Sequence, residues 1–205
     1  MPDPSTSTYS LLGLLAVKSW TGYELTHQAR RSLRFAWPSS EAHLYREQKR
    51  LVALGWASVQ KEKIGRRSRN RYSITDEGRA ALQIWLRSDP ASPRLEIEGI
   101  LRAFFADQGQ PQDLARSLRH TSMSAKEMVD ELTSYAADYL ETGGPFPERL
   151  HVIAVAAGLL HNLLASIEEY CRDAALEVDS WGTAQGLGMT DATRKRLEKM
   201  LEQRR

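Results

Sequence analysis

Four arginines gather within six residues in the first half of the chain: Arg66, Arg67, Arg69 and Arg71. A planar guanidinium group pairs with phosphate through parallel hydrogen bonds, so a cluster of this kind suits a polyanion. Solvated surface loops have the same composition. The cluster alone therefore does not separate nucleic-acid contact from simple exposure to solvent.

Two short strands are expected to hold these arginines. The ranges 56–64 and 71–75 predict the strands of a hairpin, and Gly65 is a turn residue between them. Thr75 is then expected to cap a following helix, whose first turn carries Asp76 and Glu77 at its positive end. This arrangement places the arginines at the tip of the hairpin.

A helix with two distinct faces is predicted just before the hairpin, over 41–54, and it ends at Gly55. Leucines form its apolar edge. Its polar stripe follows helical spacing and consists of His43, Arg46, Glu47 and Arg50, with Ser39, Ser40 and Lys49 nearby. On such a stripe a carboxylate can accept a hydrogen bond from cytosine and an imidazole can meet a purine edge, so Glu47 and His43 are the predicted base readers.

The order of elements predicts a winged helix-turn-helix. Helices are expected over 9–17 and from Thr21 to about residue 34, followed by the two-faced helix and the two strands. Two interpretations are open for Tyr45: it packs in the core with its hydroxyl at the edge of the core, or it contacts a DNA phosphate. The predicted DNA-binding residues are Ser39, Ser40, His43, Tyr45, Arg46, Glu47, Lys49, Arg50, Arg66, Arg67, Arg69 and Arg71.

Charge is divided unevenly along the chain. Residues 1–90 hold 15 Lys or Arg against 8 Asp or Glu, and residues 91–205 hold 13 against 18, so net charges of +7 and −5 underlie the overall +2. A basic half that meets an anion and an acidic half with another task fit this division. The stretch 88–93 contains two prolines and marks the boundary. We predict a disordered arm over 1–8, a DNA-binding domain over 9–89 and a helical domain over 90–205.

The second half predicts helices only, including two long ones over about 111–141 and 148–181. Both carry a sustained seven-residue apolar repeat, which makes helices pair lengthwise. The pairing fits an intramolecular hairpin, an intersubunit coiled coil, or both; we favour both, with a second stripe (Val152, Val155 and Leu159) left over for a second subunit. The predicted dimerisation residues are Leu114, Leu118, Met128, Leu132, Tyr135, Ile153, Ala157, Leu160, Leu164 and Ile167.

The sequence gives little support for an enzyme, a metal-binding protein or a membrane protein. The five histidines lack metal-ligand spacing, and no phosphate loop, nucleophile elbow or paired-carboxylate pattern occurs, so no enzyme, metal or cofactor is predicted. The single Cys171 fits a reducing compartment, and the apolar run 150–165 is too short to span a bilayer, which favours a cytoplasmic protein. Phe104, Phe105 and Trp85 have two readings, as core residues or as the lining of a pocket for a small apolar or aromatic effector.

The first 40% of the chain resembles the PadR family of transcriptional regulators. The resemblance lies in five segments: Gly13-Leu14-Leu15 followed by Thr21-Gly22-Tyr23-Glu24-Leu25, then Trp37-Pro38-Ser39-Ser40, Leu44-Tyr45, Leu51-Val52-Ala53-Leu54-Gly55, and Arg71-Tyr72-Ser73-Ile74-Thr75-Asp76-Glu77-Gly78. Arg46 stands where the family usually has proline, and His43 where it commonly has glycine. The resemblance implies a dimeric DNA-binding repressor that dimerises through its C-terminal helices and often releases DNA when a small molecule binds.

The expected fold class is therefore mainly α, with an N-terminal winged helix-turn-helix that has a two-stranded wing and a C-terminal all-helical dimerisation domain. Double-stranded DNA and a second copy of the chain are the predicted partners. A winged-helix adaptor that meets an acidic protein is the main rival, and an RNA-binding winged helix is a second. The basic helix face and the arginine-rich hairpin favour DNA over both.

Overall fold

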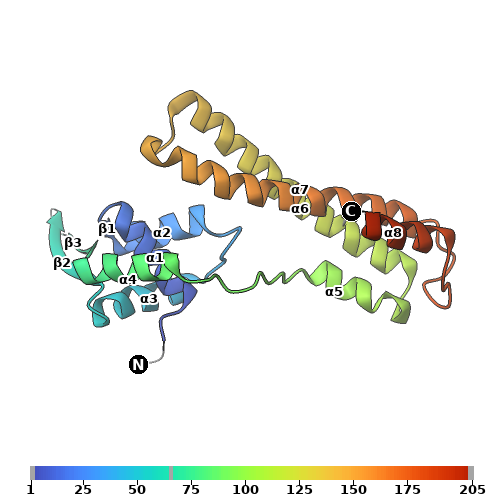
Figure 1. Ribbon diagram of the computed structural model, residues 1–205, viewed down its shortest axis with the longest axis horizontal. Coiled ribbons are helices and arrows are strands. Elements are labelled where there is room, and N and C mark those ends of the chain that lie inside the picture. The colour runs from blue at the N-terminus through green and yellow to red at the C-terminus, as the bar shows by residue number, and fades with distance from the viewer. Residues whose placement is uncertain (1–2, 65–66, 203–205) are drawn as a thin grey trace. The chain divides into compact units, whose positions relative to one another are not determined.

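The computed structural model describes residues 3–64 and 67–202 and divides the chain into two compact units, Met1–Pro93 and Arg94–Arg205. The division lies in the proline-containing stretch, a few residues after the predicted boundary. The N-terminal unit consists of α1 (Thr6–Val17), β1 (Trp20–Thr21), α2 (Gly22–Ser32), α3 (Glu41–Ala53), β2 (Ala57–Ile64), β3 (Arg67–Ile74) and α4 (Asp76–Arg87) (Figure 1). This order confirms the winged helix-turn-helix and adds the short strand β1, which the sequence did not reveal.

Helix α1 begins earlier than predicted. Ser5 is its N-cap, with the side-chain oxygen accepting a hydrogen bond from the Thr8 backbone N–H at 3.3 Å. The expected arm over 1–8 therefore contains the cap and the first turn of a helix, because a serine followed by a hydroxyl residue three positions later satisfies the free N–H groups of a first turn. Behind this cap, Leu11, Leu12 and Leu15 are fully buried.

The core of the N-terminal unit lies between its first three helices. The leucines of α1 are joined there by three more fully buried leucines, Leu25 from α2 and Leu44 and Leu51 from α3. Because these positions recur at helical spacing, each helix buries one face and leaves the other to solvent. This packing fixes which face of α3 is exposed.

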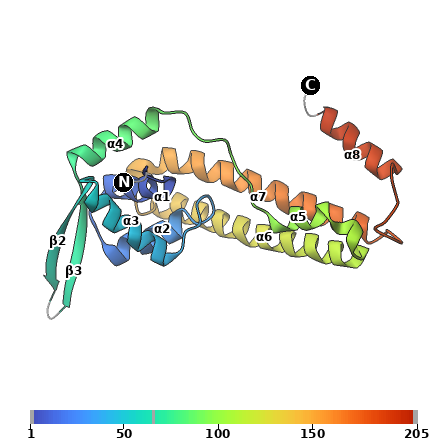
Figure 2. The same cartoon turned by 90° about the horizontal axis from the view of Figure 1, so that it is seen from below.

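The wing is longer than the sequence predicted. Strands β2 and β3 pair antiparallel from Ala57 opposite Ile74 to Ile64 opposite Arg67, and β1 pairs with the other edge of β3, giving the sheet order β1-β3-β2. Figure 2 shows the β2–β3 hairpin extending beyond the helices of its unit. Arg69 and Arg71 consequently lie within β3, on one face of the strand, rather than in a loop at the tip.

The base of the wing is anchored to α4. The Thr75 hydroxyl oxygen accepts a hydrogen bond from the Gly78 N–H at 3.0 Å, which confirms the predicted cap, and the same hydroxyl donates to the Gly55 carbonyl at 2.7 Å. A Cβ placed on Gly78 would lie 2.1 Å from the Trp56 carbonyl oxygen. Glycine is required here by the close approach between α4 and the backbone of Trp56, the residue just before β2.

The C-terminal unit is helical throughout its described part. It contains α5 (Glu98–Phe104), α6 (Pro111–Thr142), α7 (Leu150–Val178) and α8 (Asp191–Glu202), with short 3₁₀ turns at Ala106–Gln108 and Pro147–Arg149. Helices α6 and α7 run antiparallel side by side in both views (Figures 1 and 2). Gly143 ends α6 in the left-handed conformation, with φ of 78°, which is the usual role of glycine after the last turn of a helix.

The predicted dimerisation residues lie in the seam within this hairpin. Leu114 and Leu118 are buried against Cys171, Ala175 and Val178, and Ile167 packs on the same cluster. The seven others are half-buried: Met128, Leu132, Tyr135, Ile153, Ala157, Leu160 and Leu164. The reason is that both heptad seams face each other when a short connection folds the chain back on itself.

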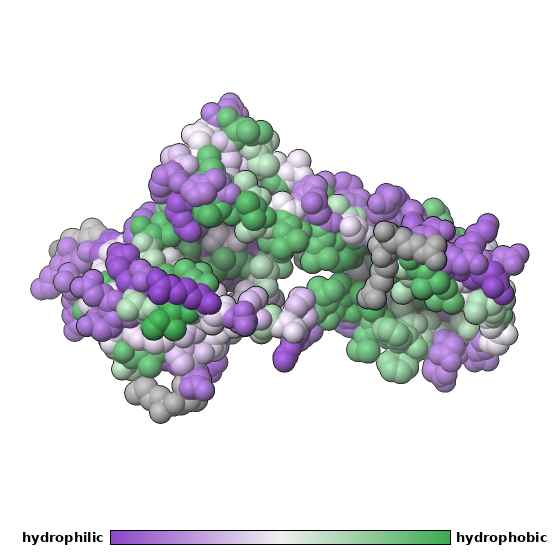
Figure 3. All heavy atoms as spheres, viewed as in Figure 1, coloured by the Kyte–Doolittle hydropathy of each residue, from purple (hydrophilic) through white to green (hydrophobic). Residues whose placement is uncertain are grey.

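A different apolar stripe of α7 is exposed. Val152, Val155 and Leu159 retain 48%, 77% and 73% of their surface, and Leu163 continues the stripe at 39%. On the face shown in Figure 3, hydrophobic residues gather along the α6–α7 hairpin and around α5. By length and composition, one helix among the described residues, Pro147–Val178, is apolar enough to cross a membrane, because it contains an 18-residue window with a mean hydropathy of 1.8. The helix is longer than the apolar run 150–165, which the sequence analysis took to be too short to span a bilayer. A single such helix is nevertheless weak evidence for a membrane span.

Candidate nucleic-acid interface

One edge of α3 is open to solvent and polar. Ser40 caps the helix by accepting a hydrogen bond from the His43 N–H at 3.3 Å. Arg46 and Lys49 are exposed, His43 and Tyr45 are half-buried, and an Arg46 guanidinium nitrogen lies 3.4 Å from His43 Nδ1. We call His43, Arg46 and Lys49 the reading edge. It presents an imidazole, a guanidinium and an ammonium group on successive turns of one helix.

The exposed edge is rotated from the one that the sequence predicted, because two polar residues of α3 face inward. Glu47 is 6% exposed and accepts a hydrogen bond from the Thr8 hydroxyl at 2.5 Å. Gln48 is 1% exposed and donates to the Gly22 carbonyl at 2.9 Å and to the Thr26 hydroxyl oxygen at 2.8 Å. A buried carboxylate that is already bonded cannot reach a base edge, so Glu47 is not retained as a base reader.

Arg50 also turns away from the reading edge. Its guanidinium donates to the Asp3 carbonyl at 2.6 Å and lies 3.9 Å from Glu47 Oε1, and its side chain is only 22% exposed. The prediction grouped Arg50 with Arg46 because both lie on one helical stripe. In the structure the Asp3 carbonyl, just before α1, accepts a hydrogen bond from Arg50. Of the other predicted residues in this region, Ser39, Ser40 and Tyr45 lie beside the three members of the reading edge.

The arginines of the wing divide into two kinds. Arg69 is exposed, whereas Arg71 is ion-paired with Glu62 on the neighbouring strand at 2.5 Å and also donates to the Ser19 carbonyl at 3.3 Å. The hydrogen bond that Arg71 donates to the Glu62 carboxylate raises the pKa of Arg71, which keeps the guanidinium charged and fixed at the base of the wing. Arg66 and the side chain of Arg67 lie outside the described residues.

Two lysines of the wing were missed from the sequence. Lys61 and Lys63 are exposed on β2, and the register places them opposite Asn70 and Ser68 on β3. Because side chains alternate along a strand, these lysines share the face opposite to that of Arg69. The alternation Lys61-Glu62-Lys63 in the sequence could have predicted that both lysines lie on one face of the strand. The wing therefore carries positive charge on both of its faces.

Helix α2 positions the reading edge. An Arg30 guanidinium nitrogen lies 3.3 Å from Glu41 in the first turn of α3, and Gln48 binds α2 further along. At its other end α2 has a capping box, in which Glu24 accepts from the Thr21 N–H at 2.8 Å and Thr21 Oγ1 accepts from the Glu24 N–H at 3.3 Å. The hydrogen bond from the Thr21 N–H to the Glu24 carboxylate is the largest cause that lowers the pKa of Glu24, and the Thr21 side chain lowers it further.

The predicted effector residues lie in different units, with Trp85 in the N-terminal unit and Phe104 and Phe105 in the C-terminal unit. Trp85 stacks on Tyr9 with ring centroids 5.0 Å apart. Phe104 and Phe105 are 77% and 63% exposed, so they are not core residues either. Phe104 forms part of a shallow apolar depression on α5 that neither of the other two aromatic residues lines.

Three helices, a basic wing and an exposed polar edge on the third helix define a winged helix-turn-helix. Residues 11–84, which lie within this N-terminal unit, match the family model for the "Transcriptional regulator PadR-like family". This match confirms the resemblance that the sequence shows to the PadR family over the N-terminal unit. The helical C-terminal region follows the matched part.

A curated relative, the negative transcriptional regulator PadR of Bacillus subtilis, is 29% identical over 99 residues, which are 47% of this chain and 54% of the relative. The alignment thus spans about half the length of that protein. Among solved structures, B. subtilis PadR in complex with operator DNA is similar with a TM-score of 0.71 and 19% identity, covering 85% of this chain and 100% of the other. The same protein in complex with p-coumaric acid gives a TM-score of 0.61 and 20% identity, covering 87% and 100%. Similarity at this level establishes a shared fold.

Proposed function

We propose that the protein is a DNA-binding transcriptional regulator that acts as a homodimer on a pseudo-palindromic operator. The observation that supports this most directly is the reading edge: three nitrogen-bearing side chains lie on the open side of the third helix of a PadR-like domain. In winged helix-turn-helix proteins this helix enters the major groove. His43 and Arg46 are positioned to meet base edges, and Lys49 to meet a phosphate.

The wing supplies affinity in this proposal. Lys61, Lys63 and Arg69 are exposed on its two faces, and the predicted tip residues Arg66 and Arg67 complete its basic character. Contacts to phosphate carry no base information but release bound counterions, so binding becomes strongly dependent on salt. Arg71 contributes differently, because its ion pair with Glu62 braces the two strands.

The second subunit binds the exposed stripe of α7. Val152, Val155 and Leu159 form a contiguous apolar face outside the hairpin seam, and apolar faces of this kind are usually covered in soluble proteins. A dimer of this kind supplies the two reading edges that a pair of half-sites about 34 Å apart requires. The oligomeric state is tested by sedimentation of the Val155→Glu and Leu159→Glu double variant, which we expect to be monomeric while the parent is dimeric.

Repression and release by a small apolar or aromatic effector extend the proposal. They are supported by the negative regulator PadR of B. subtilis, whose solved complexes contain operator DNA and p-coumaric acid. A ligand that binds the arrangement unable to bind DNA more tightly than the DNA-binding arrangement lowers the affinity for DNA. The size of the effect is set by the difference between the ligand's two binding free energies.

The test is binding of genomic fragments by the purified full chain, followed by sequencing of the retained DNA. We expect a recurrent site with two inverted half-sites. The alternative is a winged-helix adaptor that binds an acidic protein without reading DNA. Retention of all fragments equally, or of none, with the protein folded and dimeric, would favour that alternative.

A further inference from the structure

A groove of about 620 Å³ lies in the N-terminal unit beside α2 and is separate from the residues assigned to DNA. It is lined by one side of α2, by the loop that follows this helix and by the start of α3. Of the residues predicted to contact DNA, Ser39 alone lines it. Four of its lining side chains are exposed to solvent, namely those of Tyr23, His27, Arg31 and Arg34. The groove is therefore an open surface to which the proposed function gives no role.

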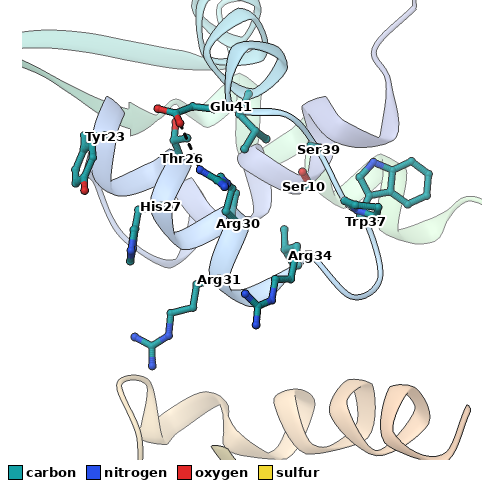
Figure 4. A pocket seen from close by; sticks show the side chains of 14 residues that line it. Ser10, Tyr23, Thr26, His27, Arg30, Arg31, Arg34, Trp37, Ser39 and Glu41 are labelled. Carbon is teal, nitrogen blue, oxygen red and sulfur yellow. Dashed lines mark hydrogen bonds and ion pairs between the residues drawn. The ribbon is translucent and has the colours of Figure 1, made fainter. Parts of the chain in front are cut away.

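Positive charge dominates the groove. Arg30, Arg31 and Arg34 line it together with His27, and Glu41 is the one carboxylate in the lining. Glu41 is ion-paired with Arg30 at 3.3 Å, so Arg31 and Arg34 carry the excess positive charge. Figure 4 shows the side chains of these two arginines pointing to the same side of the unit. An occupant that matches the lining carries negative charge, because guanidinium groups pair with carboxylate or phosphate oxygens.

Exposed aromatic rings stand at the two ends of the groove, as the labelled side chains in Figure 4 show. Trp37 is held in place because its indole N–H donates to the Ser7 hydroxyl oxygen at 3.0 Å, and it remains 46% exposed. Tyr23 stands at the other end and is 70% exposed, with its ring 6.1 Å from that of His27. Trp, Tyr and Arg are the residue types that dominate the binding energy of protein–protein interfaces. The backbone of a DNA duplex has phosphates but no apolar side chains for these rings, so the lining favours a protein segment.

The length of the groove matches a short stretch of extended chain. From Tyr23 to Arg31 the helix rises about 12 Å, at about 1.5 Å per residue. An extended peptide rises about 3.3 Å per residue, so about four of its residues span this distance. The lining runs from one ring past the arginines to the other ring. A complementary segment therefore has acidic residues in the middle and an apolar residue on each side.

We propose that this groove is a docking site for an acidic peptide segment of another protein. The carboxylates of the segment pair with Arg31 and Arg34, and its apolar side chains pack on the two aromatic rings. The contact uses no member of the reading edge or the wing, so it goes beyond the proposed function. It gives the N-terminal unit a second surface, which binds a protein.

The experiment is fluorescence anisotropy of the full chain with a fluorescein-labelled peptide that has four acidic residues between two leucines. In one control peptide serines replace the leucines, and in another Asn and Gln replace the acids. Each control should bind about tenfold more weakly or worse, because the first loses apolar burial and the second loses charge-assisted hydrogen bonds. The measurement contains no DNA, so its outcome does not depend on the proposed function.

Matched variants locate the site on the protein. Arg31→Ala combined with Arg34→Ala should weaken peptide binding by about tenfold or more, since hydrogen bonds between charged partners are lost. Lys63→Ala combined with Arg69→Ala removes the same amount of charge from the wing and should leave peptide binding unchanged. Tyr23→Ala should weaken it several-fold, and the 70% exposure of this side chain means that its removal spares the core. Thermal unfolding of each variant shows that it is folded.

Three results would overturn the site: no change in anisotropy with the acidic leucine peptide, equal binding of either control peptide, or equal losses in the groove and wing double variants. A random DNA duplex in the same assay tests the other polyanion. If the groove double variant loses duplex binding but keeps peptide binding, the two arginines are phosphate contacts and the proposal fails. A parent that binds the peptide but no DNA refutes the proposed function and leaves the docking site standing.

Discussion

The Thr8 hydroxyl donates a hydrogen bond to the Glu47 carboxylate at 2.5 Å and thereby ties the first helix to the third. Both residues are buried, with Thr8 at 0% and Glu47 at 6% exposure. A carboxylate in this position orients α3 instead of reading DNA. The bond sets which edge of the helix faces outward, and the identity of the reading edge depends on it.

Thr8→Ala should destabilise the protein by about 1–3 kcal/mol, because it leaves a buried carboxylate without its hydrogen-bond donor. Thr8→Ser keeps the hydroxyl and is the matched control. Chemical denaturation monitored by tryptophan fluorescence gives the free energy of unfolding for both. Equal stability of the alanine and serine variants would show that the bond contributes nothing to the fold.

Gly78→Ala should cost about 1–3 kcal/mol or more, because its Cβ would lie 2.1 Å from the Trp56 carbonyl oxygen and one of the two backbones must move. Gly13→Ala in α1 is the control, since nothing lies within 4 Å of the added Cβ. That change should stabilise the helix by about 0.5–1 kcal/mol. Unfolding midpoints that move together in the two variants would contradict the close approach at the base of the wing.

The capping box at the start of α2 should make stability depend on pH. The pKa of Glu24 is lowered in the folded protein, mainly by the hydrogen bond from the Thr21 N–H. Its contribution is therefore complete above the unfolded-state pKa of about 4.3 and is lost as the pH falls through the lower folded-state pKa. Glu24→Gln should be less stable than the parent near neutral pH, and the difference should shrink below about pH 4. A difference that stays constant with pH would contradict this assignment.

Removing positive charge from the wing should weaken binding to all DNA sequences alike. Lys63→Ala combined with Arg69→Ala should reduce the slope of log affinity against log salt by about 2, since each phosphate contact contributes about 0.9. Arg87→Ala, an exposed arginine at the end of α4, is the control. Measurements at several salt concentrations with operator and random DNA check this. A loss confined to the operator would assign base reading to the wing.

The order of elements followed from local signals, and so did several helix ends. Thr75 caps a helix as predicted, since its hydroxyl oxygen accepts a hydrogen bond from the Gly78 N–H at 3.0 Å, and Thr190 accepts one from the Thr193 N–H at 3.1 Å at the start of α8. Local sequence signals could not predict which edge of α3 faces solvent. Glu47 and Gln48 look like surface residues until their partners are known, and those partners lie far away in the sequence, at Thr8 and Thr26.

The heptad repeats were ambiguous for another physical reason. A seam of apolar residues every three and four positions serves equally well within a hairpin and between subunits. Leu118 and Ile167 meet inside the hairpin, and the face that remains is the exposed stripe with Val155 and Leu159. The strand β1 is too short to leave a periodic signal, since it contains two residues.

We propose that the reading edge, and not Glu47, selects the DNA sequence. The most direct test is the ratio of affinities for the selected operator and for random DNA, measured for the parent, Arg46→Ala and Glu47→Gln. We predict that Arg46→Ala lowers this ratio by about tenfold, because a good base contact discriminates by about 1–3 kcal/mol, and that Glu47→Gln leaves it unchanged. An unchanged ratio for Arg46→Ala together with a reduced ratio for folded Glu47→Gln would contradict the claim.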